Sequence, residues 1–279
     1  MKKILLAGLM LAMGALPVQA ENVPKRIVSV GGAVTEILYA IGAAERIVGS
    51  DTTSYYPQKA AQLPKVGYQR ALSAEGVLSL SPDYLLLTTD AGPGPVLKQI
   101  EAAGVKQMTV PAAHSLDQTF LNIKEIAAAV GKKTEGAKLL QNLTEKRTIL
   151  QKDIEARGKK PRILFMMQHG GGPMMVAGQK TAAQGIIELA GGVNAVSEFE
   201  GFRPLTAESA IAQAPDYILT TDLAFKSVGG VEGVLKSPGL SLTPAGKSGQ
   251  VIKMDALLLL GFGPRTVDAA RTLFDLTKS

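Results

Sequence analysis

Residues 73–90 read SAEGVLSLSPDYLLLTTD, and residues 206–222 read TAESAIAQAPDYILTTD. Both segments start with a hydroxyl residue, alanine and glutamate, pass through Pro-Asp-Tyr, and finish with Thr-Thr-Asp. Glu208 follows Glu75 at the same spacing as Asp216 follows Asp83. Each segment has the pattern of a short helix, a turn and a buried strand. The match favours duplication of one structural unit over chance convergence on Pro-Asp-Tyr turns.

Strand and helix patterns alternate on both sides of these segments. An apolar run at 26–30 predicts a buried strand, which the Gly31-Gly32 turn connects to a helix at 33–41. Further patterns predict a strand at 84–88, a loop at 92–95, a helix at 96–103 and strands at 107–110 and 162–167. Short apolar strands that alternate with helices indicate parallel sheets covered on both faces.

A different composition separates the two halves. Residues 116–157 are rich in Ala, Leu, Glu, Lys and Gln and predict two helices, the second at about 135–157 and about 35 Å long. We therefore predict an α/β protein in which two parallel-sheet βα lobes are joined by a single long helix. The predicted divisions are a signal peptide at 1–20, an N-terminal lobe at 21–133, the linking helix at 134–158 and a C-terminal lobe at 159–279.

The first twenty residues, MKKILLAGLMLAMGALPVQA, have the pattern of a secretory signal peptide with cleavage after Ala20. Pro17 and Gln19 end the apolar run before it reaches the length of a transmembrane span. The chain has no cysteine, so a lipid anchor at the cleavage point, disulfides and thiolate metal sites are all excluded. We expect a periplasmic protein without direct membrane insertion.

The charge of the chain argues against nucleic acid as a partner. The formal net charge is +6, and removal of Lys2 and Lys3 with the signal peptide leaves a smaller excess. The sequence has no long Lys/Arg block with interleaved aromatic residues. We expect a monomer that binds a small molecule.

Enzyme motifs are incomplete. His169-Gly170-Gly171-Gly172 resembles the oxyanion loop of lipases, but no serine has glycine on both sides, as a nucleophile elbow requires. A periplasmic α/β hydrolase that uses His169 as a general base is the alternative from another class of function. It lacks a nucleophile, a metal set and an acid partner. The other histidine, His114, is predicted to lie in a loop where a helix begins.

The segment Lys65-Val66-Gly67-Tyr68-Gln69-Arg70 places a tyrosine two residues before an arginine, in a predicted loop at the rim of the first lobe. A free tyrosine has a pKa near 10, but a nearby guanidinium favours the phenolate. A phenolate is a hard anionic ligand suited to ferric iron, and tyrosine is one of the axial ligands of haem. Ordinary packing of Tyr68 at the rim remains the alternative at this point.

These features together resemble the substrate-binding proteins of ATP-driven importers that carry siderophores, cobalamin or haem. The resemblance covers nearly all of the mature chain, and residues 66–76, VGYQRALSAEG, are similar to the haem-transport branch. It implies that Tyr68 is the axial iron ligand and that Arg70 is its partner. It also implies that Glu75 and Glu208, one per lobe, dock on an inner-membrane permease dimer with its ATPase.

The two glutamates have a structural explanation as well. A carboxylate in the first turn of a helix is stabilised by the helix dipole, and Ser73 and Thr206 are suited to cap those helices. Both roles are compatible, because the exposed start of a helix also suits docking.

The resemblance implies that His169 faces the haem from the second lobe. Two hypotheses stay open: His169 is a second ligand to the same iron, or it binds the iron of a second, stacked haem. We favour the stacked pair, because Gly170, Gly171 and Gly172 leave room for a flat macrocycle.

Two further residues are candidates for the haem pocket. Met174 would contribute a polarizable apolar lining, although methionine also fills ordinary cores. Arg203 is a candidate partner for a propionate, with a surface salt bridge as the alternative.

The sequence therefore predicts a protein, not an enzyme, that captures ferric haem between two lobes and delivers it to an importer. A ferric-siderophore or cobalamin carrier of the same fold is the alternative. The long helix is expected to limit the movement of the lobes.

Overall fold

The computed structural model describes residues 23–168 and 172–278. In the first half the elements are β1 (Ile27–Val30), α1 (Gly32–Ala40), η1 (Ala44–Arg46), β2 (Ile47–Ser50), α2 (Gln58–Ala61), β3 (Gly67–Tyr68), β4 (Ala71–Leu72), α3 (Ala74–Leu78), β5 (Tyr84–Thr88), α4 (Gly94–Ala102), β6 (Lys106–Val110) and α5 (Leu116–Ala129). The long helix α6 (Lys133–Arg157) follows. The predicted elements of this half are confirmed, with ends shifted by a residue or two.

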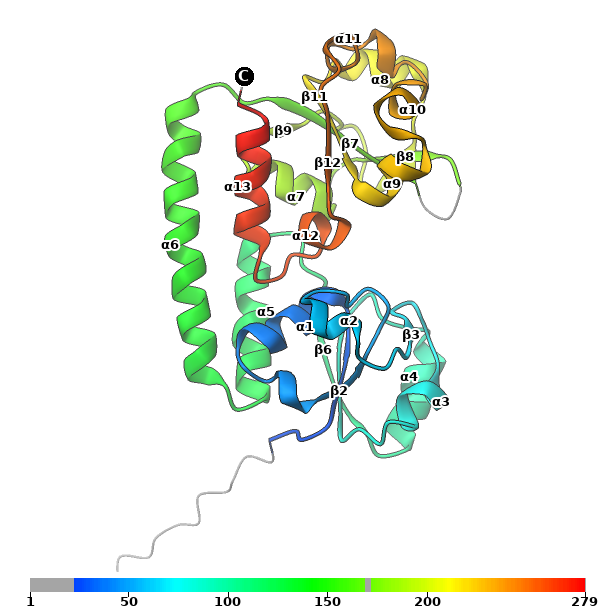
Figure 1. Cartoon of the computed structure of the whole chain (residues 1–279), viewed down its shortest axis with the longest axis vertical. Coiled ribbons are helices and arrows are strands. Elements are labelled where there is room, and N and C mark those ends of the chain that lie inside the picture. The colour runs from blue at the N-terminus through cyan, green and yellow to red at the C-terminus, as the bar shows by residue number, and fades with distance from the viewer. Residues whose placement is uncertain (1–22, 169–171, 279) are drawn as a thin grey trace, which may run out of the picture.

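The second half contains β7 (Arg162–Gln168), β8 (Met174–Ala177), α7 (Ala182–Leu189), β9 (Val193–Asn194), β10 (Phe202–Pro204), α8 (Ala207–Gln213), β11 (Tyr217–Thr221), α9 (Asp222–Ser227), α10 (Gly230–Leu235), η2 (Leu240–Leu242), α11 (Pro244–Ser248), β12 (Val251–Met254), α12 (Ala256–Leu260) and α13 (Thr266–Leu276). Figure 1 shows the two sheets in separate lobes, with α6 running alongside both.

The sheet of the N-terminal lobe is parallel, in the order β2-β1-β5-β6. Its central strands are buried on both faces. Leu86 of β5 packs with α1 and α5, whereas Leu85 and Leu87 pack on the opposite face with α3 and α4. A strand that is covered twice needs apolar side chains at every position, which explains the unbroken leucine run.

The sheet of the C-terminal lobe repeats this arrangement and adds to it. β9, β7, β11 and β12 pair in parallel, as their counterparts β2, β1, β5 and β6 do. β8 and β10 add two antiparallel strands on the same edge of β7 as β9, because β9 pairs with the start of β7 and β8 with its end. The expectation of a wholly parallel second sheet is therefore wrong at this edge. A connection of only a few residues between β7 and β8 permits antiparallel pairing alone.

The repeated Pro-Asp-Tyr motif has the same role in both lobes. The Asp83 carboxylate accepts a hydrogen bond from the backbone N–H of Arg26 at 3.0 Å, and Asp216 accepts one from that of Arg162 at 2.9 Å. Each arginine side chain also donates to backbone carbonyls just before the motif. The equivalent bonds support the duplication that the sequence indicated.

Helix α6 packs against both α5 and α13. Arg147 pairs with Asp117 at the start of α5 at 2.9 Å, and Lys146 pairs with Asp268 of α13 at 2.8 Å. The predicted linking helix is confirmed, while the division of the chain into lobes at 134 and 158 remains a prediction. Among the described residues, no helix is both long enough and apolar enough to cross a membrane.

Candidate functional site

The carboxyl ends of the strands in both sheets face one cavity of about 450 Å³. In the N-terminal lobe the cavity is lined by residues at or just beyond the carboxyl ends of the strands. These are Gly31, Gly32, Ala33 and Val34 after β1, Thr52, Thr53 and Tyr55 after β2, Thr88 and Asp90 at and after the end of β5, and Pro111, Ala112, Ala113 and His114 after β6. In the C-terminal lobe it comes from β7 (Met167, Gln168), β11 (Thr221), α9 (Leu223) and the segment after β12 (Ala256, Leu257, Leu260, Gly261, Phe262). Open α/β sheets bind their ligands at this edge.

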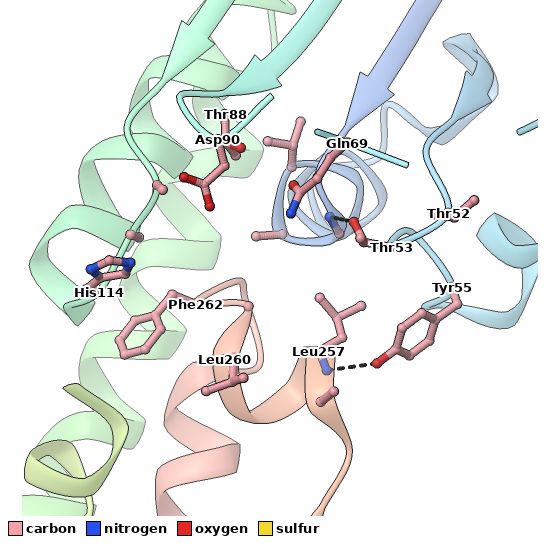
Figure 2. A pocket seen from close by; sticks show the side chains of 18 of the residues that line it. Thr52, Thr53, Tyr55, Gln69, Thr88, Asp90, His114, Leu257, Leu260 and Phe262 are labelled. Carbon is pink, nitrogen blue, oxygen red and sulfur yellow. Dashed lines mark hydrogen bonds between the residues drawn. The ribbon is translucent and has the colours of Figure 1, made fainter. Parts of the chain in front are cut away.

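The two walls of the cavity differ in polarity. Figure 2 shows Leu257, Leu260 and Phe262 on one side, and Gln69 and Asp90 on the other. Leu223 also lines the cavity from the C-terminal lobe, with two-thirds of its surface exposed. The arrangement suits a ligand with a large apolar face and polar groups at its edge.

Tyr68 lies on a short hairpin at the cavity. β3 and β4 pair in antiparallel fashion, with Tyr68 opposite Ala71, so that Gln69 and Arg70 form the turn. The sequence predicted an irregular loop here, which is wrong. Gly67 makes the hairpin possible: its φ is +107°, and a Cβ at this position would lie 2.8 Å from the Ala71 carbonyl oxygen.

A cation lies beside the Tyr68 oxygen. Arg70 Nη2 donates to Asp90 Oδ2 at 2.9 Å, and the guanidinium is also attracted to the nearby Tyr68 oxygen. Desolvation disfavours the charged guanidinium, but the bond to Asp90 and the attraction of Tyr68 and Asp90 outweigh it, so the pKa of Arg70 is raised. The structure thus brings together Tyr68 and Arg70, as predicted, and adds Asp90, which the sequence analysis missed.

His114 is a second residue that the sequence analysis left outside the site. It follows β6 just before α5, as predicted, but it also lines the cavity, where Figure 2 shows it near Phe262. Its backbone fits closely against α7, because a Cβ on Gly185 would overlap the His114 carbonyl oxygen. Its position after a parallel strand was the available signal, since all such positions share one edge of the sheet.

Of the predicted haem-contacting residues that follow β7, the structure describes only Gly172. His169, Gly170 and Gly171 lie outside the described residues. The Gly172 carbonyl accepts a hydrogen bond from Gln168 Nε2 at 2.6 Å, and Gln168 itself lines the cavity.

Met174 and Arg203 are not part of the cavity lining as described. Met174 is half-buried on β8 and packs against the apolar cluster of the C-terminal lobe. The Arg203 guanidinium lies over the ring of Phe199, 4.7 Å from its centroid. The stacking explains Arg203 without a ligand, and a role for either residue in binding remains a prediction.

Glu75 and Glu208 occupy equivalent exposed positions in the first turns of α3 and α8. The predicted caps are confirmed: Ser73 Oγ accepts from Gly76 N at 3.1 Å, and Thr206 Oγ1 accepts from Ser209 N at 3.2 Å. Each lobe therefore presents one carboxylate at the start of a capped helix.

Two contacts join the lobes, and the first of them involves residues that line the cavity. Tyr55 Oη donates to Asp255 Oδ2 at 3.0 Å and accepts from Leu257 N at 2.8 Å, as the dashed line in Figure 2 shows for Leu257. The buried Glu36 forms a two-pronged ion pair with Arg265, at 2.6 and 2.9 Å. Both contacts join residues far apart in the sequence and hold the two halves together.

A family model described as a periplasmic binding protein matches residues 27–258. The chain belongs to the periplasmic binding protein family. The described residues of this protein contain no cluster of three or more histidine, aspartate or glutamate side chains that could hold a bare metal ion.

One protein of solved structure and two proteins compared by sequence are similar to this one over most of its length. The periplasmic haem-binding protein BhuT, solved in complex with two haems, is 43% identical, has a TM-score of 0.86 and aligns over 90% of this chain and 97% of its own. The ABC transporter substrate-binding lipoprotein YvrC of Bacillus subtilis is 28% identical over 92% of this chain and 81% of its own length. A vitamin B12-binding protein of Yersinia pestis is 24% identical over 77% of this chain and 75% of its own length.

Proposed function

We propose that this protein binds ferric haem in the cavity between its lobes and delivers it to an ABC-type importer. The similarity to BhuT over nearly the whole of both chains supports haem as the ligand. One observation carries the proposal: a tyrosine that lines the cavity lies beside an arginine whose guanidinium is attracted to its oxygen. Under this proposal the haem is cargo and no bond in it is broken, so we propose no enzymatic activity.

Tyr68 would bind the iron through its oxygen. Tyrosine is one of the axial ligands of haem iron and binds it as the phenolate, and the Arg70 guanidinium beside it would be attracted to that anion. Asp90 holds Arg70 in place through the bond at 2.9 Å. The apolar residues Leu257, Leu260 and Phe262 would contact the face of the macrocycle and exclude water from it.

The second lobe would supply the remaining contacts. We retain His169 as a further iron ligand, either to the same haem or to a second, stacked haem, with the glycines after it giving space. BhuT was solved with two haems, which supports the stacked arrangement. We retain Met174 and Arg203 as candidate contacts of the ligand, outside the lining of the cavity between the lobes.

Delivery would use the two exposed glutamates. Glu75 and Glu208 lie in equivalent first turns, one on each lobe, so a permease dimer with two equivalent basic sites fits them. The similarity to an ABC transporter lipoprotein supports such a partner. The chain has no cysteine to carry a lipid, so we propose that cleavage after Ala20 leaves the protein free in the periplasm. We also propose that it acts as a monomer.

A cobalamin or ferric-siderophore carrier is the second candidate, favoured by the similarity to vitamin B12-binding proteins. The chain has no tryptophan, and only 5% of its residues are aromatic, which gives little ring surface for a corrin. Neither ligand needs a tyrosine oxygen for its metal.

A ligand panel separates these candidates. The mature protein is heated with haemin, cyanocobalamin or a ferric catecholate chelate, and its melting temperature is compared with that of the free protein. A ligand at about 100 times its Kd adds about 2.7 kcal/mol, which raises the melting temperature by about 5–10 °C for a chain of this size. We expect the shift with haemin alone. A shift with cyanocobalamin or the chelate, and none with haemin, would refute haem transport.

A further inference from the structure

The N-terminal sheet has its topological switch point between β1 and β5. The chain leaves β1 toward β2 on one side and leaves β5 toward β6 on the other, so the crevice between their carboxyl ends is open. Ligands of open α/β sheets bind in this crevice. It is formed here by the first turn of α1 and by Thr88 at the end of β5, and both line the cavity.

The first turn of α1 offers free backbone donors to the cavity. Gly31 N donates to Asp51 Oδ1 at 2.9 Å, and Gly32 N donates to Thr53 Oγ1 at 3.1 Å. In the described part of the chain, no acceptor takes the N–H groups of Ala33 or Val34, and both residues line the cavity. Unpaired donors at the start of a nine-residue helix attract negatively charged oxygen atoms.

A second and independent feature is the hydroxyl of Thr88. This residue is only 9% exposed, and its Oγ1 has no hydrogen-bond partner in the described structure. A buried hydroxyl without a partner is uncommon and costs free energy, so it indicates a group that binds there. Thr88 lies at the cavity, immediately beside the start of α1.

Gly31 allows the start of α1 to lie close to this hydroxyl and to Gln69. A Cβ at position 31 would lie 3.1 Å from Thr88 Cγ2 and 3.6 Å from both Thr88 Oγ1 and Gln69 Oε1. Figure 2 shows Gln69 and Thr88 around the first turn of the helix. The Gln69 amide carries two N–H donors as well as its oxygen, so it can complete the set of donors.

The fixed charge near this crevice is already balanced. The Asp51 carboxylate is fully buried and takes hydrogen bonds from Gly31 N, Thr53 and Ser54. The Lys65 ammonium is attracted to it and donates to the neighbouring Ser54 carbonyl at 2.8 Å. Arg70 balances Asp90 in the same way. An anion that enters the crevice therefore faces the positive end of the helix dipole and neutral donors. The charged side chains around it carry no net negative charge.

We propose that the first turn of α1, Thr88 and Gln69 form a subsite for a carboxylate of the ligand. The inference rests on the proposed function, under which that carboxylate is a propionate of haem. It places one edge of the macrocycle against the switch point of the N-terminal sheet, on the same lobe as Tyr68. The subsite would therefore fix the rotation of the haem about the iron–oxygen bond.

The test compares haemin with its dimethyl ester, in which both carboxylates are neutral. Each ligand is titrated by absorbance, in the same solvent mixture, into the parent protein, Thr88→Val, Gln69→Leu and Thr220→Val. Thr220 is the matched control: its hydroxyl is also buried and without a partner in the described structure, but it lies on β11 outside the cavity lining.

We expect Thr88→Val and Gln69→Leu each to weaken haemin binding about tenfold, as loss of a hydrogen bond to a charged group does. The same variants should change the affinity for the dimethyl ester less than twofold. Thr220→Val should leave the affinities for both ligands unchanged. If the parent protein binds neither ligand, the proposed function fails. If the parent binds both equally, or if both site variants weaken both ligands alike, haem binding stands and the carboxylate subsite is refuted.

Discussion

Tyr55 shows how one hydroxyl can join the two lobes. Burial, together with the negative charge of Asp255, raises its pKa above the usual value of 10, against the bond from Leu257 N, which lowers it. A raised pKa means that the folded protein disfavours the ionised form. The stabilisation from Tyr55 is therefore complete below about pH 10 and is lost as the pH rises further.

We predict that Tyr55→Phe lowers the free energy of unfolding at pH 7 by about 1–2 kcal/mol, because it removes a donor and an acceptor and leaves the Leu257 N–H unpaired. The deficit relative to the parent should shrink as the pH rises above about 10. Urea unfolding followed by circular dichroism at several pH values measures both effects. The neighbouring Tyr56→Phe keeps its ring over Arg265 and serves as the control. A deficit that does not change with pH would contradict this account.

Sequence reasoning identified Tyr68 and Arg70 because residues two apart are necessarily close in space. It missed Asp90 and His114 because each approaches the site from the end of a different strand, and their positions depend on the order β1-β5-β6. It named Arg203 as a candidate partner for a propionate because an arginine can pair with a carboxylate. The structure instead gives its guanidinium the ring of Phe199.

At the scale of elements, long periodic helices and apolar strands were predicted well, and very short strands were not. β3 and β4 have two residues each, too few to show a periodicity, and the positive φ of Gly67 that closes their hairpin cannot be read from composition. The caps of α3 and α8 were predicted because Ser or Thr before an acidic first turn is a local signal.

The first turns of α3 and α8 give a prediction about delivery. Glu75→Ala and Glu208→Ala should leave haem affinity within about twofold, because both carboxylates are exposed and outside the cavity lining. Each should reduce stimulation of the permease's ATPase, and the double variant more than either. Glu135→Ala, in the first turn of α6, is the matched control. Full stimulation by the double variant would exclude docking through these residues.

At the scale of the whole molecule, the sequence revealed the duplication but not the contacts between the halves. Helix α6 is tied by ion pairs to α5 and α13, and Glu36 is paired with Arg265 across the lobes. The paired residues lie far apart in the chain and share no local sequence pattern, so the sequence alone did not predict these contacts. We expect these contacts together to resist a large hinge movement.

We therefore predict that crystal structures of the free and haem-loaded protein superpose with a Cα deviation of about 1 Å or less over both lobes together. The Glu36–Arg265 and Tyr55–Asp255 contacts should be present in both. A rigid-body closure of more than about 2 Å would show that the lobes move independently.

The central claim is that Tyr68 binds the iron of a haem held between the lobes. The most direct measurement is the visible absorbance of the haemin complex of Tyr68→Phe, recorded beside those of the parent and of Tyr39→Phe, which removes a tyrosine hydroxyl on α1 outside the cavity lining. We predict that Tyr68→Phe shifts the Soret band, loses the charge-transfer band and binds at least about tenfold more weakly, while Tyr39→Phe matches the parent. An unchanged spectrum and affinity in Tyr68→Phe would contradict the claim.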